Sequence, residues 1–89
     1  MTFEQACKIA NNYFEEQVGL YGLAAASEDE EYWYFSGGKG RQNAIGNIFI
    51  SVNKNDGKIN KVNMLSKEGY KQIASSEKKE LPPQFTLQA

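Results

Sequence analysis

Residues 46–59, GNIFISVNKNDGKI, decide the fold of this chain, because they encode a β-hairpin. Aliphatic side chains occupy every second position of residues 48–52, which is the period of a strand with one face toward a core. Asp56 and Gly57 supply the turn, since glycine takes positive φ at no steric cost and aspartate hydrogen-bonds its own backbone. The chain is therefore expected to reverse direction here and to continue as a second strand over residues 59–65.

The N-terminal residues predict a helix that runs to about Gln17. Thr2 followed by Gln5 fits the capping box, in which each side chain accepts a hydrogen bond from the other residue's backbone N–H. Apolar residues recur at three- and four-residue steps and give this helix one apolar face: Phe3, Ala6, Cys7, Ala10, Tyr13, Phe14 and Val18. Gly19 is expected to end the helix.

Two more strands are expected between the helix and the hairpin. Residues 20–26 form the weaker candidate, and the aromatic run over residues 32–35 is the clearest strand by composition. Alternation places Trp33 and Phe35 on one face of this strand and Tyr32 and Tyr34 on the other. At least one aromatic face is therefore either covered by a helix or exposed to a partner.

Two polar segments flank the aromatic strand. The acidic run at residues 28–31 is expected to lie in solvent between two strands, either as a simple turn or as a contact for a basic partner. The glycine-rich run at residues 36–43 predicts a connector between strands, because a phosphate-binding loop needs Gly-Lys-Ser/Thr at the start of a helix. The turn at residues 53–57 does not fit a calcium loop, since Lys54 would occupy a position that needs an oxygen ligand.

After the hairpin, Ser66 is expected to cap a short helix that ends at about Ser75. The charged residues 77–80 are expected to be solvated. Residues 81–89 begin Leu-Pro-Pro-Gln, which predicts an extended tail that is ordered only by docking. The predicted organisation is a single α+β domain over residues 1–80, with an N-terminal helix packed on an antiparallel sheet of three or four strands and a short C-terminal helix.

Composition narrows the classes of function. The 89 residues suit one domain, and ten lysines and arginines offset eleven acids to give a net charge of −1, which argues against nucleic-acid binding. No stretch approaches the roughly 18 apolar residues of a membrane helix, and no secretory signal is visible. A cytoplasmic location is expected. The sole cysteine, Cys7, lies on the apolar face of the first helix and predicts a buried thiol rather than a reactive one.

Catalytic chemistry is not evident in the sequence. The chain has no histidine, which removes the usual general base, the commonest metal ligand and the standard activator of serine or cysteine nucleophiles. The eleven carboxylates fall in helix flanks, turns and charged runs, where solvated surface positions are the default. We therefore expect a binding protein rather than an enzyme, with no cofactor and no metal.

The order of elements resembles the YrhB-like immunity-protein family of bacterial polymorphic toxin systems. The resemblance covers nearly the whole chain and lies in the Trp33-Tyr34-Phe35 strand, in Gly46-Asn47 before an apolar strand, and in the hairpin that Gly57 closes. Two positions differ from the usual family pattern. Asn53 stands at the start of the turn in place of Asp-Lys, and the residues after Gly46-Asn47 lack the usual proline.

The resemblance implies a bacterial cytosolic antitoxin that binds a cognate toxin domain, often of peptidase type, and occludes its active site. Side chains that suit a partner surface by residue type and expected exposure are Glu28, Asp29, Glu30, Glu31, Tyr32, Tyr34, Lys39 and Arg41. A chaperone-like stress protein that binds unfolded clients is the alternative, and an inhibitor module similar to a propeptide is a third hypothesis. A homo-oligomer is compatible with the sequence but not indicated by it.

Overall fold

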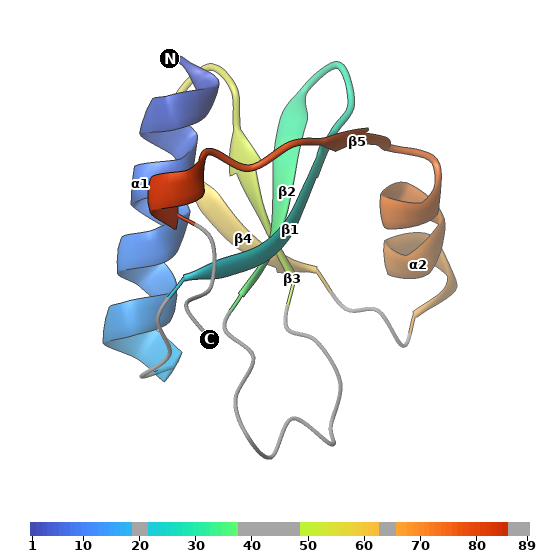
Figure 1. The fold of residues 1–89 in the computed structure, drawn as a ribbon. Coiled ribbons are helices and arrows are strands. Elements are labelled where there is room, and N and C mark those ends of the chain that lie inside the picture. Colours follow the sequence, from blue (N-terminus) through green and yellow to red (C-terminus); the bar gives the residue numbers. More distant parts are fainter. Residues whose placement is uncertain (19–21, 38–48, 63–65, 86–89) are drawn as a thin grey trace.

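The computed structural model describes residues 1–18, 22–37, 49–62 and 66–85 and confirms the α+β architecture (Figure 1). Five antiparallel strands form one sheet in the order β4-β3-β2-β1-β5, with the N-terminal helix α1 on one face and the short helix α2 on the other side of the sheet. The helices and strands are α1 Phe3–Tyr13, β1 Leu23–Glu28, β2 Tyr32–Gly37, β3 Phe49–Asn53, β4 Ile59–Val62, α2 Lys67–Ala74 and β5 Glu77–Lys79.

The predicted hairpin is present as β3 and β4, which pair in antiparallel register. Gly57 adopts a positive φ of 74° in the turn, as the sequence predicted. Asn53 holds the start of the turn, because its Oδ1 accepts hydrogen bonds from the backbone N–H groups of Asn55 at 2.7 Å and Asp56 at 3.1 Å. The predicted continuation over residues 63–65 lies outside the described residues.

The capping box that begins α1 is also confirmed. The Gln5 N–H donates to Thr2 Oγ1 at 3.1 Å, and the Thr2 N–H donates to Gln5 Oε1 at 2.9 Å. The helix differs from the prediction at its end, because the α-helical part closes at Tyr13 and the last turn, Phe14–Val18, is π-helical. Gly19, the predicted terminator, lies outside the described residues.

The core lies between α1 and the sheet. Phe3 of α1 packs on Trp33 and Phe35 of β2, with ring centroids 6.0 and 5.9 Å apart. These two aromatic residues share one face, as predicted, and α1 covers that face. Cys7 is completely buried in this layer, and burial raises the pKa of its thiol to about 11, as a structural cysteine requires. The buried apolar residues of the core are Ala6, Cys7, Ala10, Phe14, Leu23, Ala26, Trp33, Phe35, Ile50 and Val52.

The predicted number of strands was too low, because residues 77–79 form a fifth strand. β5 pairs with the Ala26–Glu28 part of β1, although the sequence suggested only a solvated charged run. Pairing uses backbone groups and needs no apolar side chain, and charged residues suit an edge strand. Lys79 also covers the core, since its Nζ lies 4.7 Å from the centroid of the Phe3 ring.

The first part of the predicted C-terminal tail folds back onto the domain. Leu81 and Phe85 pack against the core, and Pro83–Phe85 form a 3₁₀ turn rather than remaining extended. Gln84 Nε2 donates to Glu4 Oε2 of α1 at 3.2 Å. The first part of the tail is therefore ordered by docking, as the sequence predicted, and it docks on α1 of the same chain.

Candidate partner-binding surface

The acidic run lies at the end of β1 and in the β1–β2 turn, where its four carboxylates have different environments. Glu28 is the last residue of β1, and its Oε1 accepts hydrogen bonds from Lys54 Nζ and Trp33 Nε1, both at 3.1 Å. Lys79 Nζ lies 3.9 Å from its other oxygen. The hydrogen bond from Lys54 holds the pKa of Glu28 below its usual range. Glu28 is therefore half-buried and already paired within the fold, unlike the simple solvated acid that the sequence suggested.

Asp29 organises the β1–β2 turn. Its Oδ1 accepts hydrogen bonds from the backbone N–H groups of Glu31 at 2.9 Å and Tyr32 at 2.8 Å, and its Oδ2 accepts one from the Tyr34 hydroxyl. Burial favours the neutral carboxyl, but these three hydrogen bonds outweigh it and hold the pKa of Asp29 below its usual range. The carboxylate thus fixes the backbone that carries the next three residues.

Tyr34 was expected to be an exposed contact, and the structure buries it completely. Its hydroxyl donates to Asp29 and accepts a hydrogen bond from Gln72 Nε2 of α2 at 2.7 Å. Burial, with the nearby Asp29 carboxylate, raises the pKa of the Tyr34 phenol. The side chain attaches α2 to the sheet, so in this fold it is not available to a partner.

Three predicted residues remain accessible at this turn, and we call them the Tyr32 patch: Glu30, Glu31 and Tyr32. Both glutamates are exposed and form no ion pair within the described ranges. Tyr32 is half-buried, with its ring centroid 6.1 Å from that of Tyr34. The Lys54 N–H donates to the Glu31 carbonyl at 3.0 Å and so ties the β1–β2 turn to the β3–β4 turn. The backbone of the patch is therefore held both by Asp29 in its own turn and by Lys54 in the β3–β4 turn.

A polar groove of about 290 Å³ begins at Tyr32 and runs between the sheet and α2. It is lined by Tyr32, Ser51, Asn60, Lys61, Val62, Ser66, Glu68, Gly69 and Gln72. The groove extends the Tyr32 patch across the same face of the sheet. Lys39 and Arg41, the two basic candidates, lie outside the described residues.

The sequence reasoning missed the side chains that brace this surface. Neither Gln72 nor Lys54 is among the partner-surface residues predicted from the sequence, and Tyr70 of α2 is 61 % exposed. Ser66 caps α2 as predicted, with its Oγ accepting from the Gly69 N–H at 3.0 Å. Residues three apart share a helix face, and in the structure Gly69 is buried and Gln72, three residues on, contacts the sheet. No local sequence pattern indicates this contact, because the burial of Gly69 follows from the fold.

The described parts of the chain contain neither a cluster of metal-ligating side chains nor a helix of membrane-spanning character. No group of three or more histidine, cysteine, aspartate or glutamate side chains among them could hold a metal ion. None of the helices in these ranges combines the length and the apolar character that crossing a membrane requires.

The two lowered carboxyl pKa values predict acid sensitivity. A carboxyl whose pKa is lower in the folded state adds stability that is complete above its unfolded pKa and is lost as pH falls through the folded value. The urea midpoint should therefore hold between about pH 7 and 5 and fall below about pH 4, as Glu28 and Asp29 become protonated. Asp29→Asn should make the fall shallower, whereas Glu30→Gln, at an exposed position, should leave it as in the wild type. If the urea midpoint falls equally steeply with pH in the wild type, Asp29→Asn and Glu30→Gln, Asp29 does not contribute to the acid sensitivity.

No family model, curated protein or solved structure matches this chain. The resemblance to the YrhB-like family therefore stays a prediction.

Proposed function

We propose that this chain is an immunity protein that binds a cognate bacterial toxin domain and neutralises it by covering its active site. The observation that carries the proposal is the Tyr32 patch, in which an aromatic ring and two exposed acids lie together on a braced turn. A protein that blocks a toxin by occlusion needs such a surface and no reactive group of its own.

The bracing is what suits the patch to tight binding. Association loses free energy when loops must be ordered, and a surface that is already fixed avoids part of this cost. Asp29 fixes the backbone of Glu31 and Tyr32 through hydrogen bonds to their N–H groups, and Lys54 holds the Glu31 carbonyl. The backbone of the patch therefore has little freedom left to lose on binding.

The residue types favour a basic toxin surface. Tyrosine is enriched among the residues that dominate binding energy, and acids without a partner steer the approach of a positively charged surface. The polar groove beside Tyr32 extends the available area toward the roughly 800 Å² per partner that a stable complex buries.

The proposal is tested by affinity capture from the source cells, followed by expression of the captured protein. One stoichiometric partner that arrests growth alone, and is tolerated when this chain is expressed with it, is the expected result. A broad set of unrelated proteins, together with suppression of their aggregation, would instead favour the chaperone-like alternative.

Variants of the Tyr32 patch locate the interface. Tyr32→Ala should weaken toxin binding by about 30-fold, because truncating a central aromatic contact typically costs about 2 kcal/mol. The double variant Glu30→Lys/Glu31→Lys should slow association and weaken binding by at least about tenfold. Surface plasmon resonance measures both constants.

A matched control is available in the π-helical turn Phe14–Val18 that follows α1. Glu15 and Glu16 are also adjacent, exposed acids, so Glu15→Lys/Glu16→Lys changes the net charge by the same amount far along the chain from the patch. This control should retain wild-type affinity. If the patch variants fold and bind the toxin as the wild type does, the Tyr32 patch is not the interface.

A further inference from the structure

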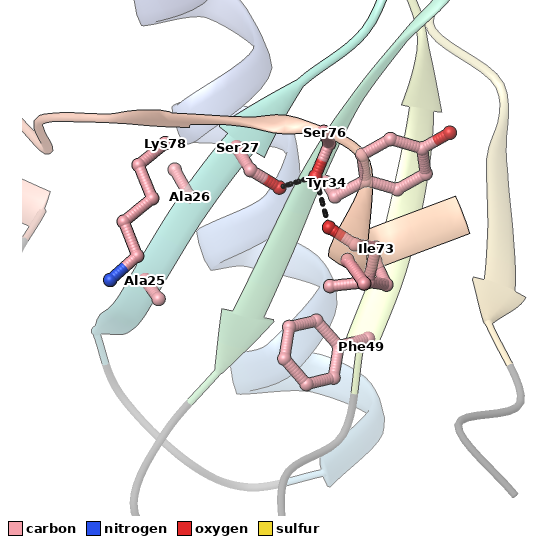
Figure 2. A pocket seen from close by; sticks show the side chains of 9 residues that line it. Ala25, Ala26, Ser27, Tyr34, Phe49, Ile73, Ser76 and Lys78 are labelled. Atoms are coloured by element: carbon pink, nitrogen blue, oxygen red, sulfur yellow. Dashed lines mark hydrogen bonds between the residues drawn. The ribbon is translucent and has the colours of Figure 1, made fainter. Parts of the chain in front are cut away.

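A second hollow, of about 260 Å³, lies between the sheet and α2 on the β1 side of Tyr34 (Figure 2). Phe49 of β3, Ile73 of α2 and Ala25 of β1 give it apolar walls. The complete lining is Ala25, Ala26, Ser27, Tyr34, Phe49, Ile73, Ala74, Ser76 and Lys78. The hollow is separate from the Tyr32 patch and plays no part in the proposed function.

The hydroxyl groups around this hollow already have hydrogen-bond partners. Ser76 Oγ donates to the Ile73 carbonyl at 2.6 Å and lies 2.7 Å from Ser27 Oγ, as Figure 2 shows. The Tyr34 hydroxyl is held by Asp29 and Gln72. A bound molecule would therefore meet a surface that behaves as apolar, because these polar atoms have their partners.

Lys78 is the exception in the lining. It belongs to β5 opposite Ser27, and its side chain runs along the β1 edge of the hollow toward Ala25 (Figure 2). Its ammonium group is exposed and forms no ion pair with any residue that the structure describes, whereas the next lysine, Lys79, lies near Glu28. Within the described ranges, the lining of the apolar hollow therefore carries a positive charge, that of Lys78, with no acidic partner.

We propose that this hollow binds a small apolar monocarboxylate, with the apolar body between Phe49 and Ile73 and the carboxylate paired with Lys78. Size supports this class, because an apolar cavity of about 150 Å³ holds a benzene-sized molecule, and the present hollow has room for a ring with a short acidic arm. Charge supports it as well, since an acid group would pair the free ammonium while its apolar part covers the walls.

The test is titration of the full chain with 3-phenylpropionate and, separately, with its neutral amide, followed by backbone NMR. We expect saturable shifts at Ala25, Phe49 and Ile73, with the acid binding about fivefold more tightly than the amide, as an exposed ion pair allows. Lys78→Met should abolish this preference. Lys71→Met, which removes an exposed lysine of α2 that does not line the hollow, should preserve it.

Filling the hollow tests its location. Ala74→Phe should weaken binding of both probes by at least about tenfold, because the added ring takes the space of the ligand. If that variant does not fold, Ala25→Leu serves the same purpose from the sheet side. Absence of saturable shifts up to the solubility limit of the acid, or equal affinity of acid and amide for the wild type, would overturn the proposal. So would unchanged binding in a folded, filled variant.

Discussion

Replacing Tyr34 with alanine should lower the free energy of unfolding by about 3–5 kcal/mol, as truncation of a buried aromatic side chain typically does. The ring is completely buried on the central strand of the sheet, and its hydroxyl joins Asp29 of the β1–β2 turn to Gln72 of α2. Domains of this size are stable by only about 5–15 kcal/mol, so the variant should lose much of its stability. Urea unfolding followed by the fluorescence of Trp33 measures the loss.

The hydroxyl contribution can be separated from that of the ring. Tyr34→Phe keeps the ring, removes both hydrogen bonds and should cost about 1–2 kcal/mol. Tyr32→Phe is the matched control two residues earlier on the same strand face, and it should change stability by less than about 0.5 kcal/mol, as a half-buried surface tyrosine does. If the two phenylalanine variants were equally stable, the Asp29–Tyr34–Gln72 hydrogen bonds would add nothing to the fold.

The second large effect is expected at Gly37, where β2 meets the ring of Phe14. A Cβ atom at position 37 would lie 2.4 Å from two ring atoms of Phe14 and 2.5 Å from a third, closer than real Cβ contacts allow. Gly37→Ala must therefore displace a ring that is fully buried, and such overpacking costs about 1–3 kcal/mol. Thermal or urea unfolding of the variant measures this cost.

A double-mutant cycle identifies the cause. Phe14→Leu alone should be destabilising, because a smaller side chain leaves space in the core. In the combined variant Gly37→Ala/Phe14→Leu, the new methyl group occupies part of that space, so the two losses should sum to more than the loss measured for the double variant. Strict additivity would show that the cost at Gly37 does not come from the Phe14 ring.

The parts of the fold that sequence predicted are those with a local cause. The capping box of Thr2 and Gln5, the Ser66 cap and the positive φ of Gly57 each depend on residues within a few positions of one another. The division of the aromatic strand into two faces follows from the two-residue period alone. Such features do not depend on the position of distant parts of the chain.

The fifth strand and the burial of Tyr34 could not be predicted in this way. β5 forms because the chain returns to β1 after α2, and its own residues, Glu77–Lys79, carry no strand signal. Tyr34 is buried because α2, almost 40 positions later in the sequence, lies over it; Gln72 and Tyr34 are 38 residues apart. Both outcomes depend on contacts between segments that are remote in the sequence.

The candidate site also contains residues whose environment the local sequence predicts and residues whose environment depends on distant contacts. Glu30, Glu31 and Tyr32 keep the accessibility that their residue types predicted. Glu28 is half-buried like Tyr32, but it is paired with Lys54, 26 residues away, and no local pattern signals that pairing. Asp29 is the intermediate case: its hydrogen bonds to the next residues are typical of a turn, whereas its bond to the Tyr34 hydroxyl depends on the paired strands.

Lys54 links the β3–β4 turn to the β1–β2 turn through both its backbone and its side chain. The Lys54 N–H holds the Glu31 carbonyl, while its ammonium group pairs with Glu28 and lies 5.2 Å from the centroid of the Trp33 ring. A substitution that removes the Lys54 contacts is therefore expected to shift the Tyr32 patch without changing any residue in it. Under the proposed function, the choice of toxin would then depend on a turn that lies outside the contact residues.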